Sequence, residues 1–169
     1  MGKFRFLTLY TGNSDLNIDI QQAYYLDGIS ICDSLFSGNK PVREQYQDYL
    51  QFKGVKRVLA DIKNGCVEEK DKELAKEIKN AIAWVENGCK DPIKMELNVD
   101  ADDYDFLKGF YNLICSTKVL AYLQKNRKGE FEYFEVDFIN YTGNKKYYVI
   151  NSTTPNFSWK FVGDFKGLK

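Results

Sequence analysis

The chain has no histidine among its 169 residues and only three prolines. Without histidine there is no Ser-His-Asp or Cys-His nucleophile system, no HExxH or Cys2His2 zinc site and no imidazole general base. Charge of one sign is not in excess either, because 24 Lys and Arg residues balance 24 Asp and Glu residues. A dedicated nucleic-acid-binding protein normally carries a basic excess, so direct nucleic-acid binding is not expected.

Long apolar runs, phosphate-binding glycine motifs and paired cysteines are also missing. No segment approaches the roughly 18 apolar residues of a membrane-spanning helix, and the apolar stretch near the N-terminus is too short for a secretion signal. The sequence contains no GxGxxG motif, no P-loop motif and no CxxC pair among its four cysteines. We therefore expect a cytoplasmic protein with reduced thiols, no membrane association, no cofactor and no metal.

Helix and strand patterns follow one another along a chain that is 44% hydrophobic. They predict strands at 3–10, within 17–39, at 92–99 and at 157–162, a hairpin over 131–153 turning on residues 142–144, and helices over 42–64 with a break at Gly54, 69–87, 100–116 and 117–128. Asn64-Gly65 and Asn87-Gly88 are predicted helix ends, since both residue types tolerate positive φ. These elements predict an α+β fold: one globular domain over residues 1–169, with a mostly antiparallel sheet and a helical middle segment.

The densest cluster of charge is the acidic run Asp100, Asp102, Asp103 and Asp105. It does not fit a calcium loop, because Tyr111 stands where an EF-hand needs its bidentate Glu. The run favours either the start of a helix, whose dipole attracts acidic residues, or an acidic patch that faces a partner.

A basic stretch occurs beside aromatic residues: Lys53, Lys56, Arg57 and Lys63 are close in sequence to Tyr46, Tyr49 and Phe52. Such a mixture is found in proteins that bind single-stranded nucleic acid. Because these three aromatic residues fall on the apolar stripe of the predicted helix, we expect core aromatics with solvated basic residues instead.

Twelve tyrosines and two tryptophans are more than a small core requires. Tyr is favoured at protein interfaces, because it buries a large rigid area and keeps a polar tip. Exposure is expected for some of Tyr104, Tyr133, Tyr141, Tyr147 and Trp159, while filling of the sheet face is an equal alternative. The predicted partner-binding residues are Asp102, Asp103, Tyr104 and Asp105, with Tyr141, Tyr147 and Trp159 as a second group.

The C-terminal part of the chain has an order of motifs that resembles a known family. SxxVLxxL at 116–123 is followed by FEYFEVDF at 131–138 and YYVIN at 147–151. This order resembles the C-terminal signature of an immunity-protein family of bacterial polymorphic-toxin systems, which commonly has a proline where Glu135 stands here. The resemblance implies a non-enzymatic cytoplasmic protein that binds a cognate toxin and blocks it.

Missing catalytic motifs, surplus tyrosine and this resemblance together lead to the hypothesis of a stoichiometric protein-binding inhibitor, an immunity protein against a bacterial toxin. One alternative is a phage or mobile-element inhibitor of a bacterial defence complex, similar in role to an anti-CRISPR protein. Another is a histidine-independent enzyme that uses carboxylates such as Glu96, Asp102 or Glu135 in a pocket.

Overall fold

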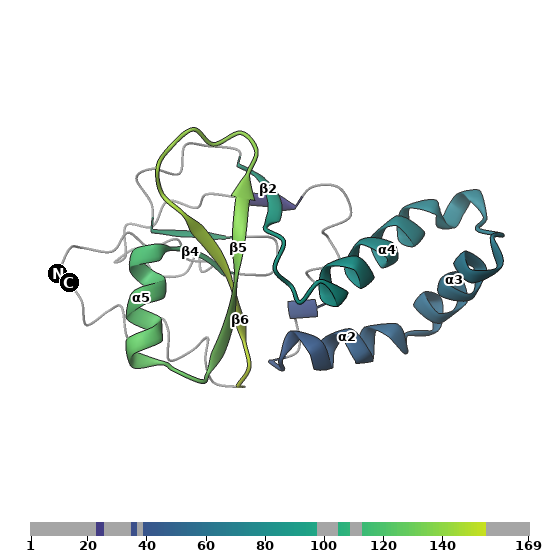
Figure 1. Ribbon diagram of the computed structural model, residues 1–169, viewed down its shortest axis with the longest axis horizontal. Helices are drawn as coiled ribbons and strands as arrows, with labels where there is room; N and C mark the ends of the chain where they lie inside the picture. Colours follow the sequence, from purple (N-terminus) through teal and green to yellow (C-terminus); the bar gives the residue numbers. More distant parts are fainter. Residues whose placement is uncertain (1–22, 26–34, 37–38, 98–104, 109–112, 155–169) are drawn as a thin grey trace, which may run out of the picture.

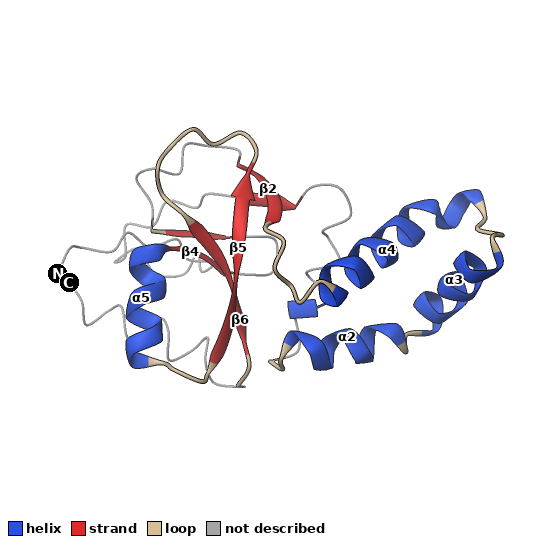
Figure 2. Cartoon of the chain, viewed as in Figure 1, coloured by secondary structure: helices blue, strands red, loops and turns tan. Residues whose placement is uncertain are grey.

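The computed structural model describes residues 23–25, 35–36, 39–97, 105–108 and 113–154. Its helices are α2 (Val42–Leu50), α3 (Lys53–Asn64), the short 3-10 helix η1 (Glu69–Asp71), α4 (Lys72–Glu86) and α5 (Thr117–Asn126). Its strands are β1 (Ala23–Tyr25), β2 (Ile93–Leu97), β3 (Phe106–Lys108), β4 (Leu113–Ser116), β5 (Phe131–Phe138) and β6 (Tyr147–Ser152), as Figure 2 shows.

The six strands form one sheet in the order β1-β2-β5-β6-β4-β3. Neighbouring strands are antiparallel except β2 and β5, which are parallel. The predicted α+β class, with a mostly antiparallel sheet and helices in the middle of the chain, is therefore confirmed. The strands predicted at 3–10 and 157–162 lie outside the described residues.

Two predicted features of the sheet are confirmed in detail. In β2, Ile93, Met95 and Leu97 are buried and the residues between them are exposed, as a strand with one face on the core requires. The hairpin is formed by β5 and β6, in which Phe134 lies opposite Val149.

Glycine ends the helices where the sequence predicts. Gly65 has φ +67°, and the next amide, of Cys66, donates a hydrogen bond to the carbonyl oxygen of Asp61 at 3.0 Å. Gly88, after α4, has φ +76°. The predicted break at Gly54 is displaced, because Gln51 and Phe52 separate α2 from α3 and Gly54 lies in the first turn of α3.

The helix predicted over residues 100–116 is wrong for the part that the structure describes. Residues 106–108 and 113–116 form β3 and β4, with Leu107 opposite Ile114. Phe106 and Leu107 are both buried, and so are Ile114 and Cys115. Successive side chains of a strand point to opposite faces, so these apolar pairs fit two strands that are buried on both faces rather than a helix with one apolar side.

Helices α2, α3 and α4 project from one side of the sheet, and α5 lies on the other side of the molecule (Figure 1). We call residues 42–86 the helical lobe. Three rings join it to the sheet: Trp84 of α4 lies 5.1 Å from Phe134 of β5, and Phe36 lies 6.1 Å from Trp84 and 5.5 Å from Phe134 between ring centroids. The hydrophobic core is thus continuous from the lobe into the sheet.

A group of hydrogen bonds, which we call the polar joint, holds the start of α2 on the sheet. The Glu132 carboxylate accepts a bond from the Val42 amide at 2.8 Å and another from the Asn151 side-chain amide at 2.9 Å. Asn151 also donates to the Lys40 carbonyl oxygen at 2.9 Å, and Gln45 donates to the same carbonyl at 2.6 Å. Glu132 therefore satisfies a free amide at the helix N-terminus, where a negative charge is favoured.

Candidate functional site

Alternate residues of β2 and β5 form an exposed surface on one face of the sheet. Lys94 lies opposite Asp137 in the parallel pair, and Glu135 lies opposite Tyr148 in the antiparallel pair. Residues opposite each other point to the same face, so these side chains share it. We call this surface the open face; it consists of Lys94, Glu96, Phe131, Tyr133, Glu135, Asp137 and Tyr148.

The open face ends at β6. In the next strand Cys115 lies opposite Tyr148, and it is completely buried. Its neighbour Ile114, which points to the other face, is completely buried as well. Tyr148, half-buried, therefore marks the margin of the open face.

Aromatic rings occupy one end of the open face. Tyr133 is 46% exposed, which is high for a large ring in the middle of a strand. Its ring meets that of Tyr148 edge to face, with centroids 5.9 Å apart, and the ring of Phe131 lies 6.4 Å away. These contacts hold Tyr133 in place and leave part of its surface accessible.

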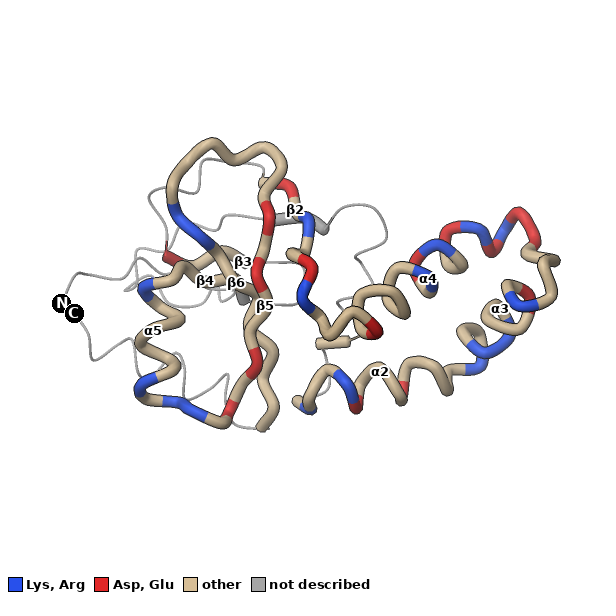
Figure 3. Tube along the Cα trace, in the orientation of Figure 1, with Lys and Arg blue, Asp and Glu red and all other residues tan. Residues whose placement is uncertain are grey.

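Carboxylates occupy the rest of the open face. Glu96, Glu135 and Asp137 are exposed, and Figure 3 shows the acidic positions recurring along β5. No ion pair within the described part of the chain uses any of the three. Lys94, opposite Asp137, is the basic residue of the open face. The surface therefore combines accessible aromatic area with a local excess of negative charge.

Four of the predicted partner-binding residues, Asp102, Asp103, Tyr104 and Trp159, lie outside the described residues. The fifth, Asp105, is buried and accepts a hydrogen bond from the Ser116 hydroxyl at 2.8 Å. The ammonium groups of Lys118 and Lys145 each lie 4.0 Å from its carboxylate. Ser116 is the N-cap residue of α5, and its hydroxyl bonds to Asp105, so Asp105 has a structural environment and is not part of the open face.

The other two, Tyr141 and Tyr147, pack against each other. Tyr147 is 1% exposed, and its ring lies 5.4 Å from Phe138 and 5.9 Å from Tyr141. The half-buried Tyr141 accepts a hydrogen bond from the Lys145 amide at its hydroxyl, at 3.2 Å. We therefore leave both out of the candidate surface; the exposed tyrosine of this hairpin is Tyr133.

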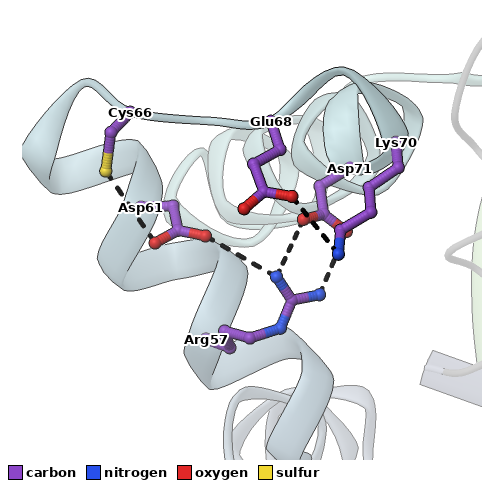
Figure 4. Close-up of polar contacts among 6 residues, drawn as sticks. All are labelled: Arg57, Asp61, Cys66, Glu68, Lys70 and Asp71. Atoms are coloured by element: carbon purple, nitrogen blue, oxygen red, sulfur yellow. Dashed lines mark hydrogen bonds and ion pairs between the residues drawn. The ribbon is translucent and has the colours of Figure 1, made fainter.

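Within the basic stretch of the helical lobe, Arg57 forms ion pairs inside the lobe, and the lysines are exposed. Arg57 of α3 donates two hydrogen bonds to Asp71, at 2.8 and 3.0 Å, and lies 3.7 Å from Asp61 (Figure 4). The hydrogen bonds and the charge of Arg57 hold the pKa of Asp71 below its usual value. This pair ties α3 to the start of α4. Tyr46 and Tyr49 are buried, as expected for core aromatics, but the expectation is wrong for Phe52, which lies between α2 and α3 and is 55% exposed.

The structure describes two of the three carboxylates considered for a histidine-independent enzyme. Glu96 and Glu135 are exposed on the open face, and Asp102 lies outside the described residues. One pocket, of about 270 Å³, lies beside α4 and is lined by Val67, Lys72, Ala75, Lys76, Lys79 and Asn80, with no carboxylate among them.

Of the thiols in the described part of the chain, Cys66 is exposed, Cys89 is half-buried and Cys115 is buried. No group of three or more cysteine and acidic residues there could hold a metal ion. Burial, with a smaller contribution from the Asp105 charge, raises the pKa of Cys115 far above its ordinary value, so this thiol stays protonated. Burial also raises the pKa of the half-buried Cys89. Among the described helices, none is long and apolar enough to span a bilayer.

Comparison of the chain with protein-family models, with curated proteins and with solved structures gave no match. The functional interpretation therefore depends on the open face itself.

Proposed function

We propose that this protein is a non-enzymatic inhibitor that binds a cognate bacterial toxin in the cytoplasm, and that the open face is its contact surface. The observation that supports the proposal most is the exposure of the Tyr133 side chain. This residue is 46% exposed, is held by neighbouring rings and stands beside carboxylates that have no ion-pair partner among the described residues.

Interfaces concentrate their binding energy in a few aromatic anchors, and complementary charge around them speeds association and selects the partner. Tyr133 with Tyr148 supplies the first feature, and Glu96, Glu135 and Asp137 supply the second. The surface thus favours a partner whose binding region is basic. An enzyme that acts on nucleic acid has such a region, because it must attract phosphates.

The segment that resembles the immunity-protein family contributes most of this surface. SxxVLxxL corresponds to Ser116 and α5, FEYFEVDF is β5, and YYVIN lies in β6. These strands bring Tyr133, Glu135 and Tyr148 together. The free thiols of Cys66, Cys89 and Cys115 also suit the reducing cytoplasm in which such an inhibitor acts.

Co-expression with the product of the adjacent toxin gene tests the proposal. We expect a stable 1:1 complex in size-exclusion chromatography and survival of cells that express both proteins. Tyr133→Ala should weaken the complex by about 30-fold, the effect of losing a strong aromatic anchor. Phe52→Ala is the matched control, because Phe52 is 55% exposed but lies between α2 and α3, away from the sheet.

The outcomes test the identity of the partner and the location of the contact surface separately. Absence of any complex with the toxin would remove the toxin-inhibitor function. A complex that Tyr133→Ala leaves unchanged would show that the open face is not the contact surface. Capture of a bacterial defence component, with the same dependence on Tyr133, would favour the alternative role of a phage or mobile-element inhibitor.

A further inference from the structure

Resting on the proposed function, we infer that the open face receives an arginine side chain of the partner, stacked on Tyr133 and paired with Glu135. The inference concerns the chemistry of the group that binds there. It follows from the position of Glu135 on β5, which lies two residues from Tyr133 and opposite Tyr148 of β6.

The three groups that would hold the guanidinium lie on one face of two paired strands. Glu135 is directly opposite Tyr148, and the ring of Tyr148 contacts that of Tyr133. Tyr133 and Glu135 are two residues apart on β5, which places their backbones about 7 Å apart. A cation stacked within about 6 Å of the Tyr133 ring centroid can therefore reach the Glu135 carboxylate.

Glu135 is the carboxylate of the open face best placed for an incoming cation. Asp137 faces Lys94 directly across the parallel pair, so its charge is already partly compensated. Glu135 faces the neutral ring of Tyr148 instead. Glu132, one strand position from Tyr133, points to the other face and is occupied by the polar joint.

Arginine fits these groups better than lysine does. A guanidinium is planar, stacks on an aromatic ring and donates two parallel hydrogen bonds to one carboxylate. An ammonium is a compact, strongly hydrated charge that offers neither planar stacking nor a bidentate fork. The combination of exposed ring and neighbouring carboxylate thus selects for the guanidinium.

Peptide probes test the inference on the full chain without knowledge of the toxin. A short peptide with three arginines is titrated against the protein and followed by NMR chemical shifts. Two peptides of the same sequence, with lysine or with the neutral arginine isostere citrulline, are titrated in parallel. We expect the arginine peptide to bind at least threefold more tightly than either, with the largest shifts at Tyr133, Glu135 and Tyr148.

Variants then assign the contacts. Tyr133→Leu and Glu135→Gln should each weaken binding of the arginine peptide by about two- to fivefold, as expected for an exposed cation–π contact or ion pair. Asp137→Asn should weaken it less. Phe52→Leu and Glu73→Gln are the matched controls, since both residues are exposed on the helical lobe and should leave the affinity unchanged.

Equal affinity for arginine and citrulline peptides, or for arginine and lysine peptides, would overturn the inference, as would full affinity in Tyr133→Leu. If the toxin complex forms and depends on Tyr133 while the arginine peptide shows no preference, the inference fails and the proposed function stands. If the arginine peptide binds as expected but no toxin complex forms, the proposed function fails instead.

Discussion

Asn151→Ala tests whether the polar joint fixes the helical lobe on the sheet. Asn151 is completely buried. Its side-chain nitrogen donates to the Lys40 carbonyl and to the Glu132 carboxylate, both at 2.9 Å, and its oxygen accepts a bond from Gln45 at 3.3 Å. The variant removes all three bonds and leaves Glu132 with the Val42 amide alone.

The size of the effect follows from these bonds. A neutral hydrogen bond contributes about 1 kcal/mol to stability and one to a charged group about 2 kcal/mol, while the long bond from Gln45 adds little. We therefore expect the free energy of unfolding to fall by about 3 kcal/mol. For a chain of this length the melting temperature should fall by about 6–12 °C.

Urea unfolding followed by circular dichroism and by tryptophan fluorescence measures the loss. Trp84 reports on the contact between lobe and sheet, since its ring lies 5.1 Å from Phe134. Asn126→Ala is the matched control: this side chain also donates to a carbonyl, that of Tyr122 at 2.9 Å, but on an exposed surface. A loss below about 0.5 kcal/mol in Asn151→Ala, the range of ordinary surface substitutions, would refute a stabilising role for the polar joint.

Three further predictions concern the helical lobe. Asp71→Asn should lower the melting temperature at neutral pH. Because Arg57 depresses the pKa of Asp71, this contribution is complete above its ordinary pKa of 3.8 and is lost as the pH falls through the depressed value. Thermal unfolding of both proteins should therefore show a smaller difference in melting temperature at pH 2 than at pH 7. Burial, with a smaller effect of the Glu77 charge, raises the pKa of Tyr49 to about 12, and its hydroxyl has no hydrogen-bond partner in the described structure. Tyr49→Phe should thus raise the free energy of unfolding at pH 7 by up to about 1 kcal/mol, and urea titrations should show that it loses less stability than the wild type between pH 10 and 12. Gly65→Ala should lower the free energy of unfolding by about 1–2 kcal/mol, because φ is +67° at this position. Gly54→Ala should raise it by up to about 1 kcal/mol in the same assay, because Gly54 lies inside α3 with open space around it.

The elements that the sequence predicts well are those with a local signal. Strand β2 alternates strictly between apolar and polar residues, and α3 and α4 end at Asn-Gly pairs. Residues 100–116 lack such a signal, since the acidic start suggests a helix while the apolar pairs that follow fit a strand. These residues form strands because β3 pairs with β4 and β4 pairs with β6. The local sequence does not identify these pairing partners.

The candidate site could be predicted only in part. The sequence identifies a hairpin rich in tyrosine, but it does not say which face of the hairpin is covered. Tyr147 and Tyr148 are adjacent, yet Tyr147 lies in the core and Tyr148 lies at the margin of the open face. A shift of one residue in register would exchange their positions, so the assignment needs the strand pairing and the packing of the helical lobe.

Strand β5 contains the strongest argument that the open face has a role beyond stability. Glu132 and Glu135 are carboxylates of one strand, and their spacing of three residues places them on opposite faces of the sheet. Glu132 points to the face covered by the helical lobe, where two hydrogen bonds use its oxygen and fix α2. Glu135 points to the open face beside an exposed ring, and no described residue forms an ion pair with it. A surface of this kind contributes little to folding, and this is the ground on which we propose that Tyr133 and the carboxylates beside it serve the binding of a partner.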